Sequence, residues 1–301
     1  MDIPMRRRAV FGLGATAGLA VLGLDVGTAH AAGPSLPILG PPQGNRLHVM
    51  SFNIRVPVDG GARSWGNRLP RIVRVVKAEQ PTILGTQEGR KSQIQDLVDR
   101  LPGYRFVARP SEAGGRGATC AILYRHDRLK KIDSGHLWLS DRPHQAGSIT
   151  WGNRFPRMMT WVKFEDRNTG KKFIHVNTHF DHVSSESRRK SARFVRQWIR
   201  DRSLPTLVSG DFNTTPGSTP HDTLTSGKVF DTWNRPEKRR TPSFKTANGW
   251  NPVPKRSDRR IDWILGTDGV AVHATAINTW VTKHRNTPSD HWAIQAVVSL
   301  P

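Results

Sequence analysis

Short segments in which apolar and polar residues alternate recur along most of the chain, and this period of two predicts β-strands. The first such segment is 47–56 (LHVMSFNIRV), and the turn-forming residues Pro57, Gly60 and Gly61 follow it. The segment 205–210 (PTLVSG), which leads into Asp211, predicts a buried strand. Further strands are predicted at 82–86, 104–108, 119–125, 129–139, 157–166, 172–180, 261–266, 270–281 and 292–299.

Three segments carry apolar residues at helical spacing instead. Residues 68–79 form the first, with Pro70 near the start, where a helix tolerates it. A second helix is predicted at 91–101, and an amphipathic third helix at 185–201. Many strands, interspersed helices and long hairpin-like stretches predict an α/β sandwich built on two sheets, rather than a doubly wound parallel sheet.

The N-terminal segment predicts an export signal. Three arginines at 6–8 precede an apolar, Gly/Ala-rich stretch, which ends in a small-residue cleavage site at 29–31 (AHA). Adjacent arginines before a weakly apolar stretch that contains Asp25 favour the twin-arginine (Tat) pathway. The stretch is shorter than the ~20 residues of a membrane-spanning helix. We therefore expect a Tat-type signal peptide at 1–31 and one secreted domain at 32–301.

Composition narrows the class of partner. The chain has 46 Lys and Arg against 24 Asp and Glu, a formal net charge of +22. This imbalance favours polyanions such as nucleic acid, anionic lipid or a phosphate-bearing wall polymer, and the alternative is a charge that serves only solubility. No stable protein partner is implied, so a monomer is expected. The single cysteine, Cys120, excludes an intrachain disulfide and is expected to be buried and without a catalytic role.

Five segments place metal-binding or phosphate-binding side chains at or next to strand ends. They are SFN (51–53), QE (87–88), NTHFDH (177–182), GDFN (210–213) and SDHW (289–292). Each is weak evidence alone, because an Asp after Gly is usually a turn residue and a His in a strand is usually structural. Phosphodiester cleavage needs an aligned nucleophile and neutralisation of the phosphoryl charge. Hard oxygen ligands of this kind suit Mg²⁺ or Mn²⁺.

In this order, the five motifs resemble the endonuclease/exonuclease/phosphatase family, which includes pancreatic-type DNases, abasic-site endonucleases, bacterial sphingomyelinases and inositol-polyphosphate 5-phosphatases. The resemblance extends from Asn53 to His291. The runs DSGHLWLSDRP (133–143) and TWVKF (160–164) are similar to a secreted bacterial branch of that family. The resemblance implies a DNase I-like four-layer α/β sandwich, in which helices flank two central mixed sheets.

The resemblance also implies a divalent-metal site. Glu88 would be the principal ligand of a Mg²⁺ or Mn²⁺ ion, with Asn53 beside it and Asp290 completing the metal side. Asp211 would orient or deprotonate the attacking water, and Asn213 would hold a phosphoryl oxygen or the nucleophile in line.

Four further residues receive roles from the resemblance. His291 would contact the scissile phosphate, oriented by Asp262 through its other ring nitrogen, as in catalytic triads. His179 would donate to another phosphoryl oxygen. Tyr124, which closes the AILY strand, matches a family position that reaches the phosphate.

One departure from the family pattern concerns Ala118. Relatives in this branch commonly carry Gly-Glu-Tyr where this chain has Gly-Ala-Thr at 117–119. In DNase-like members that glutamate partners the histidine matching His179, so its loss predicts a lower pKa and a looser orientation for this histidine. Either Asp181 or His182 compensates, or activity is reduced or redirected.

Two loops share the sequence Trp-Gly-Asn-Arg. The first contains Trp65 and Arg68, and the second contains Trp151 and Arg154. One hypothesis is that the loops form paired walls of a substrate cleft, in which the arginines contact phosphate and the tryptophans stack on a ring. The alternative is two similar capping turns whose tryptophans pack on the core.

A basic run that precedes Asp262 contains Lys255, Arg256, Arg259 and Arg260. We expect it to border the active site and to contact substrate phosphates beyond the scissile one, with an affinity for nucleic acid that falls steeply with salt.

The sequence thus favours an exported, divalent-metal-dependent phosphodiesterase whose substrate is a nucleic acid, that is, a nuclease. The alternatives are a sphingomyelinase or phospholipase C-like enzyme, a phosphomonoesterase, and a non-catalytic protein that binds polyanions. Loops around a shared metal core decide between these substrates.

Overall fold

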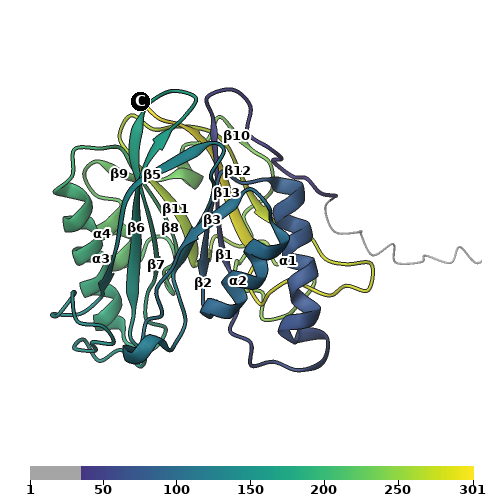
Figure 1. Cartoon of the computed structure of the whole chain (residues 1–301), viewed down its shortest axis with the longest axis horizontal. Coiled ribbons are helices and arrows are strands. Elements are labelled where there is room, and N and C mark those ends of the chain that lie inside the picture. Colours follow the sequence, from purple (N-terminus) through teal and green to yellow (C-terminus); the bar gives the residue numbers. More distant parts are fainter. Residues whose placement is uncertain (1–34) are drawn as a thin grey trace, which may run out of the picture. The chain divides into compact units, whose positions relative to one another are not determined.

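The computed structural model describes residues 35–301 and arranges their strands in two mixed sheets (Figure 1). The first sheet has the order β10 (Lys238–Arg239), β12 (Ala271–Asn278), β13 (Ala293–Ser299), β1 (Leu47–Asn53), β2 (Ile83–Gln87), β4 (Ala121–Arg125) and β3 (Tyr104–Val107). The second has the order β5 (Leu129–Trp138), β6 (Met158–Asp166), β7 (Lys172–His179), β8 (Thr206–Asp211), β11 (Asp262–Thr267) and β9 (Val229–Asp231). The signal peptide expected at 1–31 lies outside the described residues.

Four α-helices of the described residues cover the outer faces of these sheets (Figure 1). On the first sheet lie α1 (Trp65–Glu79) and α2 (Lys91–Arg100), and their buried residues share an apolar cluster with β1, β2 and β4. On the second sheet lie α3 (Ser185–Arg200) and α4 (Thr219–Leu224). The layer order helix, sheet, sheet, helix confirms the predicted four-layer sandwich.

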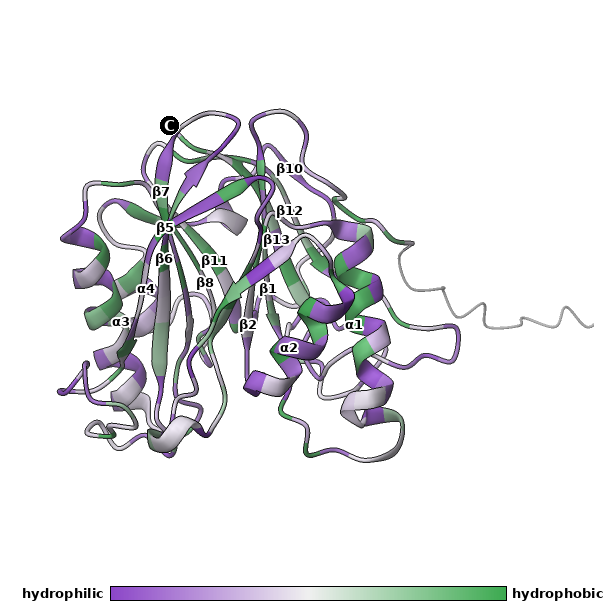
Figure 2. Ribbon diagram, viewed as in Figure 1, coloured by the Kyte–Doolittle hydropathy of each residue, from purple (hydrophilic) through white to green (hydrophobic). Residues whose placement is uncertain are grey.

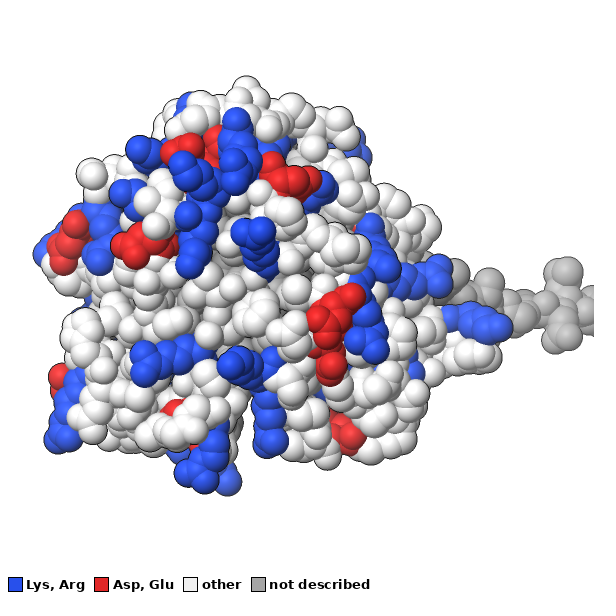
Figure 3. Space-filling view, in the orientation of Figure 1, with Lys and Arg blue, Asp and Glu red and all other residues white. Residues whose placement is uncertain are grey.

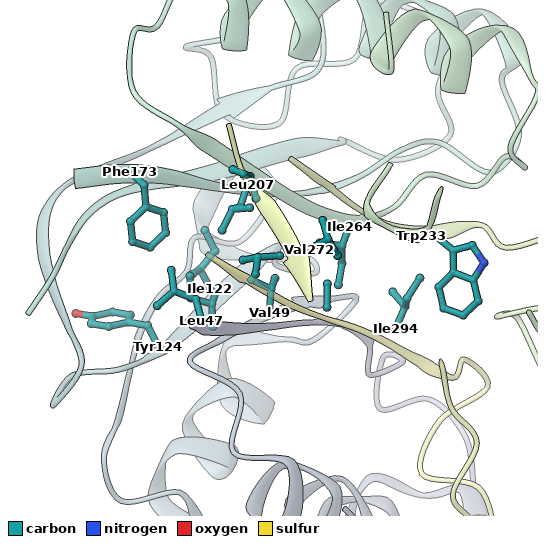
Figure 4. Close-up of a cluster of buried hydrophobic side chains, with 14 of the residues drawn as sticks. Leu47, Val49, Ile122, Tyr124, Phe173, Leu207, Trp233, Ile264, Val272 and Ile294 are labelled. Carbon is teal, nitrogen blue, oxygen red and sulfur yellow. The ribbon is translucent and has the colours of Figure 1, made fainter. Parts of the chain in front are cut away.

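Apolar side chains fill the interfaces between these layers. Figure 2 shows hydrophobic residues along the central strands and hydrophilic residues on the outer sides of the helices. Between the sheets, Leu47 and Val49 of β1 lie in one buried cluster with Phe173, Leu207 and Ile264 of the second sheet (Figure 4). Burial of each such side chain contributes about 1.5–3 kcal/mol. The two sheets therefore form a stable scaffold for the residues at their edges.

Buried hydrogen bonds also join the two sheets beneath the carboxyl ends of β2 and β7. Gln87 donates from Nε2 to Oδ1 of Asn177 at 2.7 Å, and Asn177 donates from Nδ2 to the carbonyl oxygen of Thr86 at 2.8 Å. The sheets approach so closely that a Cβ atom on Gly85 would lie 2.2 Å from Oγ of Ser209. Only glycine fits there, and the network fixes the spacing of the strand ends that carry chemistry.

Every strand and helix predicted from periodicity is present, with bounds that shift by a few residues. No periodicity predicts α4, β9 or β10, because their lengths of six, three and two residues are too short to show one. Cys120 is buried, as predicted, and burial raises the pKa of its thiol to about 12, which keeps it unreactive. Among the described residues, no helix combines the length and apolar character needed to cross a bilayer.

Candidate active site

The strand ends that carry polar side chains meet at one edge of the two sheets. Strands β1 and β2 are parallel, with Asn53 opposite Gln87, and β7 and β8 are parallel, with His179 opposite Asp211. Strand β11 runs antiparallel to β8, so its first residue, Asp262, pairs with Asp211. The crossovers through α1 and α3 return the chain to the starting end of each parallel pair, so the carboxyl ends align.

A pocket of about 560 Å³ opens at this edge. The predicted site residues on its wall are Glu88, His179, Asp211, Asn213, Asp290 and His291. Asn53 and Asp262 lie behind the wall, each hydrogen-bonded to a lining residue. Separate segments of the sequence therefore surround one cavity. The wall also includes Arg55, Arg90, Phe155 and Arg157, which the sequence does not single out.

Asp211 is a buried carboxylate at the centre of the site. Its Oδ2 accepts a hydrogen bond from Nδ2 of Asn53 at 3.0 Å, and its Oδ1 accepts one from the backbone nitrogen of Asn213 at 3.0 Å. Burial raises the pKa of Asp211, and the nearby carboxylate of Asp262 raises it further. A fixed carboxylate with a raised pKa is a competent proton acceptor near neutral pH.

His291 and Asp262 form a buried pair next to Asp211. Nδ1 of His291 donates to Oδ2 of Asp262 at 2.9 Å, and Nε2 lies 3.9 Å from Oδ2 of Asp211. Burial alone would lower the pKa of His291, but the charges of Asp262 and Asp211 raise it to about 10. The imidazole is therefore protonated at neutral pH, and its Nε2–H group is free to bind an anionic oxygen.

His179 also faces Oδ2 of Asp211, and it has an arginine as its partner. Nη1 of Arg157 lies 3.0 Å from Nδ1 of His179, and Nη2 of the same guanidinium lies 2.9 Å from Nδ1 of His182. Burial and then Arg157 hold the pKa of His179 well below its usual range. Nε2 of His179 lies 3.0 Å from Nδ2 of Asn213, which is a donor group, and 3.5 Å from Oδ2 of Asp211.

The position of Ala118 explains this arrangement in part. Ala118 lines the pocket and offers no carboxylate to His179. Asp181 accepts hydrogen bonds at Oδ1 from the backbone of Val183 and Ser184, and its Oδ2 lies 3.4 Å from Nε of Arg157, the guanidinium that contacts His179. The expected lowering of the His179 pKa is therefore present, with burial as its largest cause. The expected looser orientation is not, because Arg157 holds the ring.

Glu88 and Asp290 form the acidic side of the pocket. Arg55 lies 3.7 Å from a carboxylate oxygen of each residue, which is too long for a hydrogen bond. Burial raises the pKa of Asp290, and the negative charge of Glu88 adds to this shift. Two half-buried carboxylates that repel each other make an oxygen donor set that fits a hard divalent cation.

Asn53 holds the carboxylates of Glu88 and Asp211 in position. Its Nδ2 donates to Oε1 of Glu88 at 3.1 Å and to Asp211, while its Oδ1 accepts from the backbone nitrogen of Arg55 at 3.0 Å. Asn53 thus lies beside Glu88, as predicted, and its amide nitrogen faces the acidic residues. Its place among the residues that hold the metal ion stays a prediction.

One further group of side chains has metal-ligand geometry among the described residues. Ligand atoms of Asp211, Asp262 and His291 all lie within 4.8 Å of one another. A protonated imidazole has no lone pair for a metal ion, so an ion in this group would have to displace one of the two ring protons of His291.

The prediction that Tyr124 reaches the phosphate is wrong. Tyr124 lies in the core between the sheets, with its ring centroid 4.9 Å from that of Phe164 (Figure 4). Strand β4 is antiparallel to β2, and the register pairs Tyr124 with Ile83 and Ala121 with Thr86. The first residue of β4 therefore lies near the active site, and Tyr124 lies toward the opposite edge.

The first Trp-Gly-Asn-Arg loop does not form a wall of the pocket, so the cleft hypothesis is wrong for Trp65 and Arg68. Trp65 donates from Nε1 to Oδ2 of Asp96 at 2.7 Å. Arg68 is fully buried in α1 and donates to the carbonyl oxygens of Ile54, Arg55, Val56 and Arg63. The hydrogen bonds from its guanidinium hold the loop that follows β1 in place, and they thereby position Arg55.

Arg68→Met is expected to lower the free energy of unfolding by about 3 kcal/mol, because buried carbonyl groups lose their donors. It is also expected to lower activity through the displaced loop at 54–56. Urea unfolding checks the first effect, and Arg74→Met, at an exposed position of the same helix, is the matched control. Equal losses of stability in the two variants would contradict the proposed closure of the loop.

The second loop reaches the pocket, but through other residues than those predicted. Trp151 is buried and donates from Nε1 to Oδ1 of Asp141 at 2.7 Å, so its ring is unavailable for stacking. Arg154 does not line the pocket, whereas Phe155 and Arg157 do. The alternative of packed tryptophans is therefore correct for both loops.

The basic run before Asp262 does not border the pocket either. None of Lys255, Arg256 and Arg259 contributes to its wall. Lys255 lines a smaller cavity together with Lys245 and Trp292. The prediction was based on their closeness in sequence to Asp262, and it is wrong because the chain reaches β11 through an exposed loop.

Comparison with known proteins agrees with this geometry. The model of the Endonuclease/Exonuclease/phosphatase family matches residues 50–291, so the chain belongs to this family. The mannosyl-6-phosphatase Bt3783 of Bacteroides thetaiotaomicron shares 28% identity and a TM-score of 0.78, over 84% of this chain and 100% of that one. A family structure from Bacteroides vulgatus shares 31% identity and a TM-score of 0.79, over 85% of this chain and 99% of that one.

Among curated proteins, the uncharacterized protein L388 of Acanthamoeba polyphaga mimivirus is 34% identical over 161 residues, 50% of this chain and 59% of that protein. The chain spans about half the length of the curated relatives it matches. Family membership and the site together define a metal-dependent phosphoesterase, which is a hydrolase.

Proposed function

We propose that this protein is an exported phosphodiesterase of the secreted bacterial branch, which uses Mg²⁺ or Mn²⁺ to hydrolyse nucleic acid. The observation that carries the proposal is the position of Asp211 in one pocket between the protonated His291 and the acidic pair Glu88 and Asp290. The pocket thus contains a proton acceptor, a cationic donor and an oxygen donor set within reach of one phosphate.

Glu88 and Asp290 would hold the ion, with Asn53 fixing the orientation of Glu88. The bound ion would supply charge neutralisation at the phosphoryl oxygens. We assign the group of Asp211, Asp262 and His291 to proton and phosphate chemistry rather than to metal binding, because Asp262 is already hydrogen-bonded to Nδ1 of His291 at 2.9 Å and does not line the pocket.

Different side chains of the pocket carry out the remaining steps of the hydrolysis. Asp211 accepts a proton from water as the water oxygen bonds to phosphorus, and the leaving oxygen departs with the electrons of its bond. His291 donates from Nε2 to a phosphoryl oxygen whose negative charge grows, and Asp262 keeps this ring charged and oriented. Asn213 and His179, whose Nδ2 and Nε2 atoms lie 3.0 Å apart, hold the nucleophile or a phosphoryl oxygen in line.

The charge of the protein supports a polyanionic substrate. Figure 3 shows patches of Lys and Arg side chains scattered over the visible face, with smaller patches of Asp and Glu beside some of them. Arg55, Arg90 and Arg157 add positive charge to the pocket wall itself. Such a surface attracts nucleic acid through its phosphates, and added salt is expected to weaken that attraction. Export through the Tat pathway is tested by locating the full-length protein in the culture medium.

A phosphomonoesterase acting on a small sugar phosphate is the second candidate. Two observations favour it: the residues expected to bind distant phosphates do not line the pocket, and Bt3783, a mannosyl-6-phosphatase, shares 28% identity over 84% of this chain. The metal core serves both chemistries, so the groups around it decide the substrate.

The test is hydrolysis by residues 32–301 of plasmid DNA, RNA, bis-p-nitrophenyl phosphate, mannose 6-phosphate and sphingomyelin, with Mg²⁺, Mn²⁺ or EDTA. We expect metal-dependent cleavage of nucleic acid that fails in His291→Asn. Faster turnover of mannose 6-phosphate would establish the second candidate, and faster turnover of sphingomyelin would establish a lipid phosphodiesterase. Absence of turnover with every metal would indicate a protein that only binds polyanions.

A further inference from the structure

Phe155 is an aromatic side chain that stays largely exposed in the wall of the catalytic pocket. It is 47% exposed, and it lines the pocket beside His182. Its exposure contrasts with that of Trp151 in the same loop, which is 7% exposed and packs on Phe194. Phe155 therefore adds little to the core, and the exposed part of its ring is available to a ligand.

The ring is held in place by its neighbours. It stacks on the imidazole of His182, with ring centroids 6.0 Å apart and planes 19° apart, and the guanidinium of Arg154 lies 5.7 Å from its centroid. Nδ2 of Asn153, which is 5% exposed, donates to the carbonyl oxygen of Phe155 at 2.7 Å. Arg157 fixes His182 in turn. Because the platform is ordered before a ligand arrives, binding costs little additional entropy.

Arg157 connects this platform to the reacting centre. One guanidinium contacts both His182, under Phe155, and His179, which faces Asp211. A group that stacks on Phe155 would thus lie close to a phosphate bound at Asp211, because the Arg157 side chain contacts the histidines next to both positions. Arg154 and Arg157 surround the platform with positive charge, which suits a ring linked to phosphate and does not suit an acyl chain.

We infer that Phe155, supported by His182, is a binding subsite for a nucleobase next to the scissile phosphate. The inference rests on the proposed phosphodiesterase function and names the ring-recognition residue of that pocket. Stacking on a single aromatic side chain tolerates every base, so the subsite would favour nucleotides over other phosphate esters without selecting a sequence.

The experiment compares the binding of adenosine 5′-monophosphate and ribose 5-phosphate by calorimetry in Mg²⁺. These ligands share the phosphate and the pentose and differ in the base. The His291→Asn protein is the background, so that neither ligand is hydrolysed. Phe155→Ala removes the ring, Phe155→Trp retains a stacking surface, and Ile149→Ala is the control, because Ile149 is 44% exposed and does not line the pocket.

We expect adenosine 5′-monophosphate to bind on the order of tenfold more tightly than ribose 5-phosphate. Phe155→Ala should abolish this preference without changing the affinity for ribose 5-phosphate, whereas Phe155→Trp and Ile149→Ala should keep it. Equal affinities in the background protein, or an equal loss for both ligands in Phe155→Ala, would overturn the inference. A base preference without hydrolysis of any substrate would sink only the proposed function, and hydrolysis without a base preference would sink only the inference.

Discussion

Replacing His291 by asparagine is expected to lower kcat by about 10³-fold, because the variant loses the charged Nε2–H donor to the phosphoryl oxygen. Asparagine keeps a donor near the position of Nδ1, so Asp262 retains its partner. Alanine at this position would leave both oxygens of the buried Asp262 without a donor, since Oδ1 already has none. A fall in the activity of that variant could then come from lower stability as well as from the lost catalytic group. Steady-state kinetics with bis-p-nitrophenyl phosphate give the comparison.

The pH profile gives a second measure of the same group. Asp262 and Asp211 raise the pKa of His291 to about 10 against the effect of burial, so the active, protonated form exists below that value. Wild-type kcat is therefore expected to fall as pH rises through about 10, and His291→Asn should lack this limb. His144→Ala, at an exposed position, is the control. Near wild-type activity in His291→Asn would exclude the proposed role.

Replacing Glu88 by glutamine is expected to lower kcat/KM by about 10²- to 10³-fold, because the bound ion contributes several kcal/mol of charge stabilisation. The variant also loses the electrostatic repulsion between Glu88 and Asp290. In the wild type, this repulsion adds to the effect of burial and raises the pKa of Asp290. We therefore expect Glu88→Gln to be at least as stable as the wild type in EDTA. Mg²⁺ should raise the Tm of the wild type and leave that of the variant unchanged.

Thermal unfolding with and without Mg²⁺ separates metal binding from catalysis. Glu237→Gln is the matched control, because Glu237 is exposed and does not line the pocket. A Tm increase of wild-type size in Glu88→Gln would show that the ion binds elsewhere. The group formed by Asp211, Asp262 and His291 would then be the first alternative.

Most of the site could be predicted because it is encoded at strand ends. Asn53, His179 and Asp211 each follow a short apolar run, and the register of the two parallel pairs brings those ends together. Arg157 and Arg55 could not be predicted, because arginine and lysine are so abundant in this chain that no single one stands out. Arg157 directly precedes the first residue of β6, and its position at the end of a strand is a signal that could have been used.

The errors have one physical origin. Tyr124 closes an apolar strand just as His179 does, yet β4 runs antiparallel to its neighbour β2, so the carboxyl end of β4 lies toward the opposite edge. The two Trp-Gly-Asn-Arg loops are alike in sequence, but Arg68 is buried against backbone carbonyls, and the second loop lines the pocket through Phe155 and Arg157. Two segments with the same short sequence can therefore pack against different neighbouring residues.

The sequence by itself determined the strands, the helices and the chemical type of the side chains at strand ends, because periodic burial is a local property of the chain. It also determined the family, through motifs that stand next to those strands. Only the tertiary structure decided which strand ends share an edge, which arginine holds His179 and which aromatic ring stays open to a ligand. These features depend on strand direction and on contacts between distant segments, which the packing of the two sheets sets.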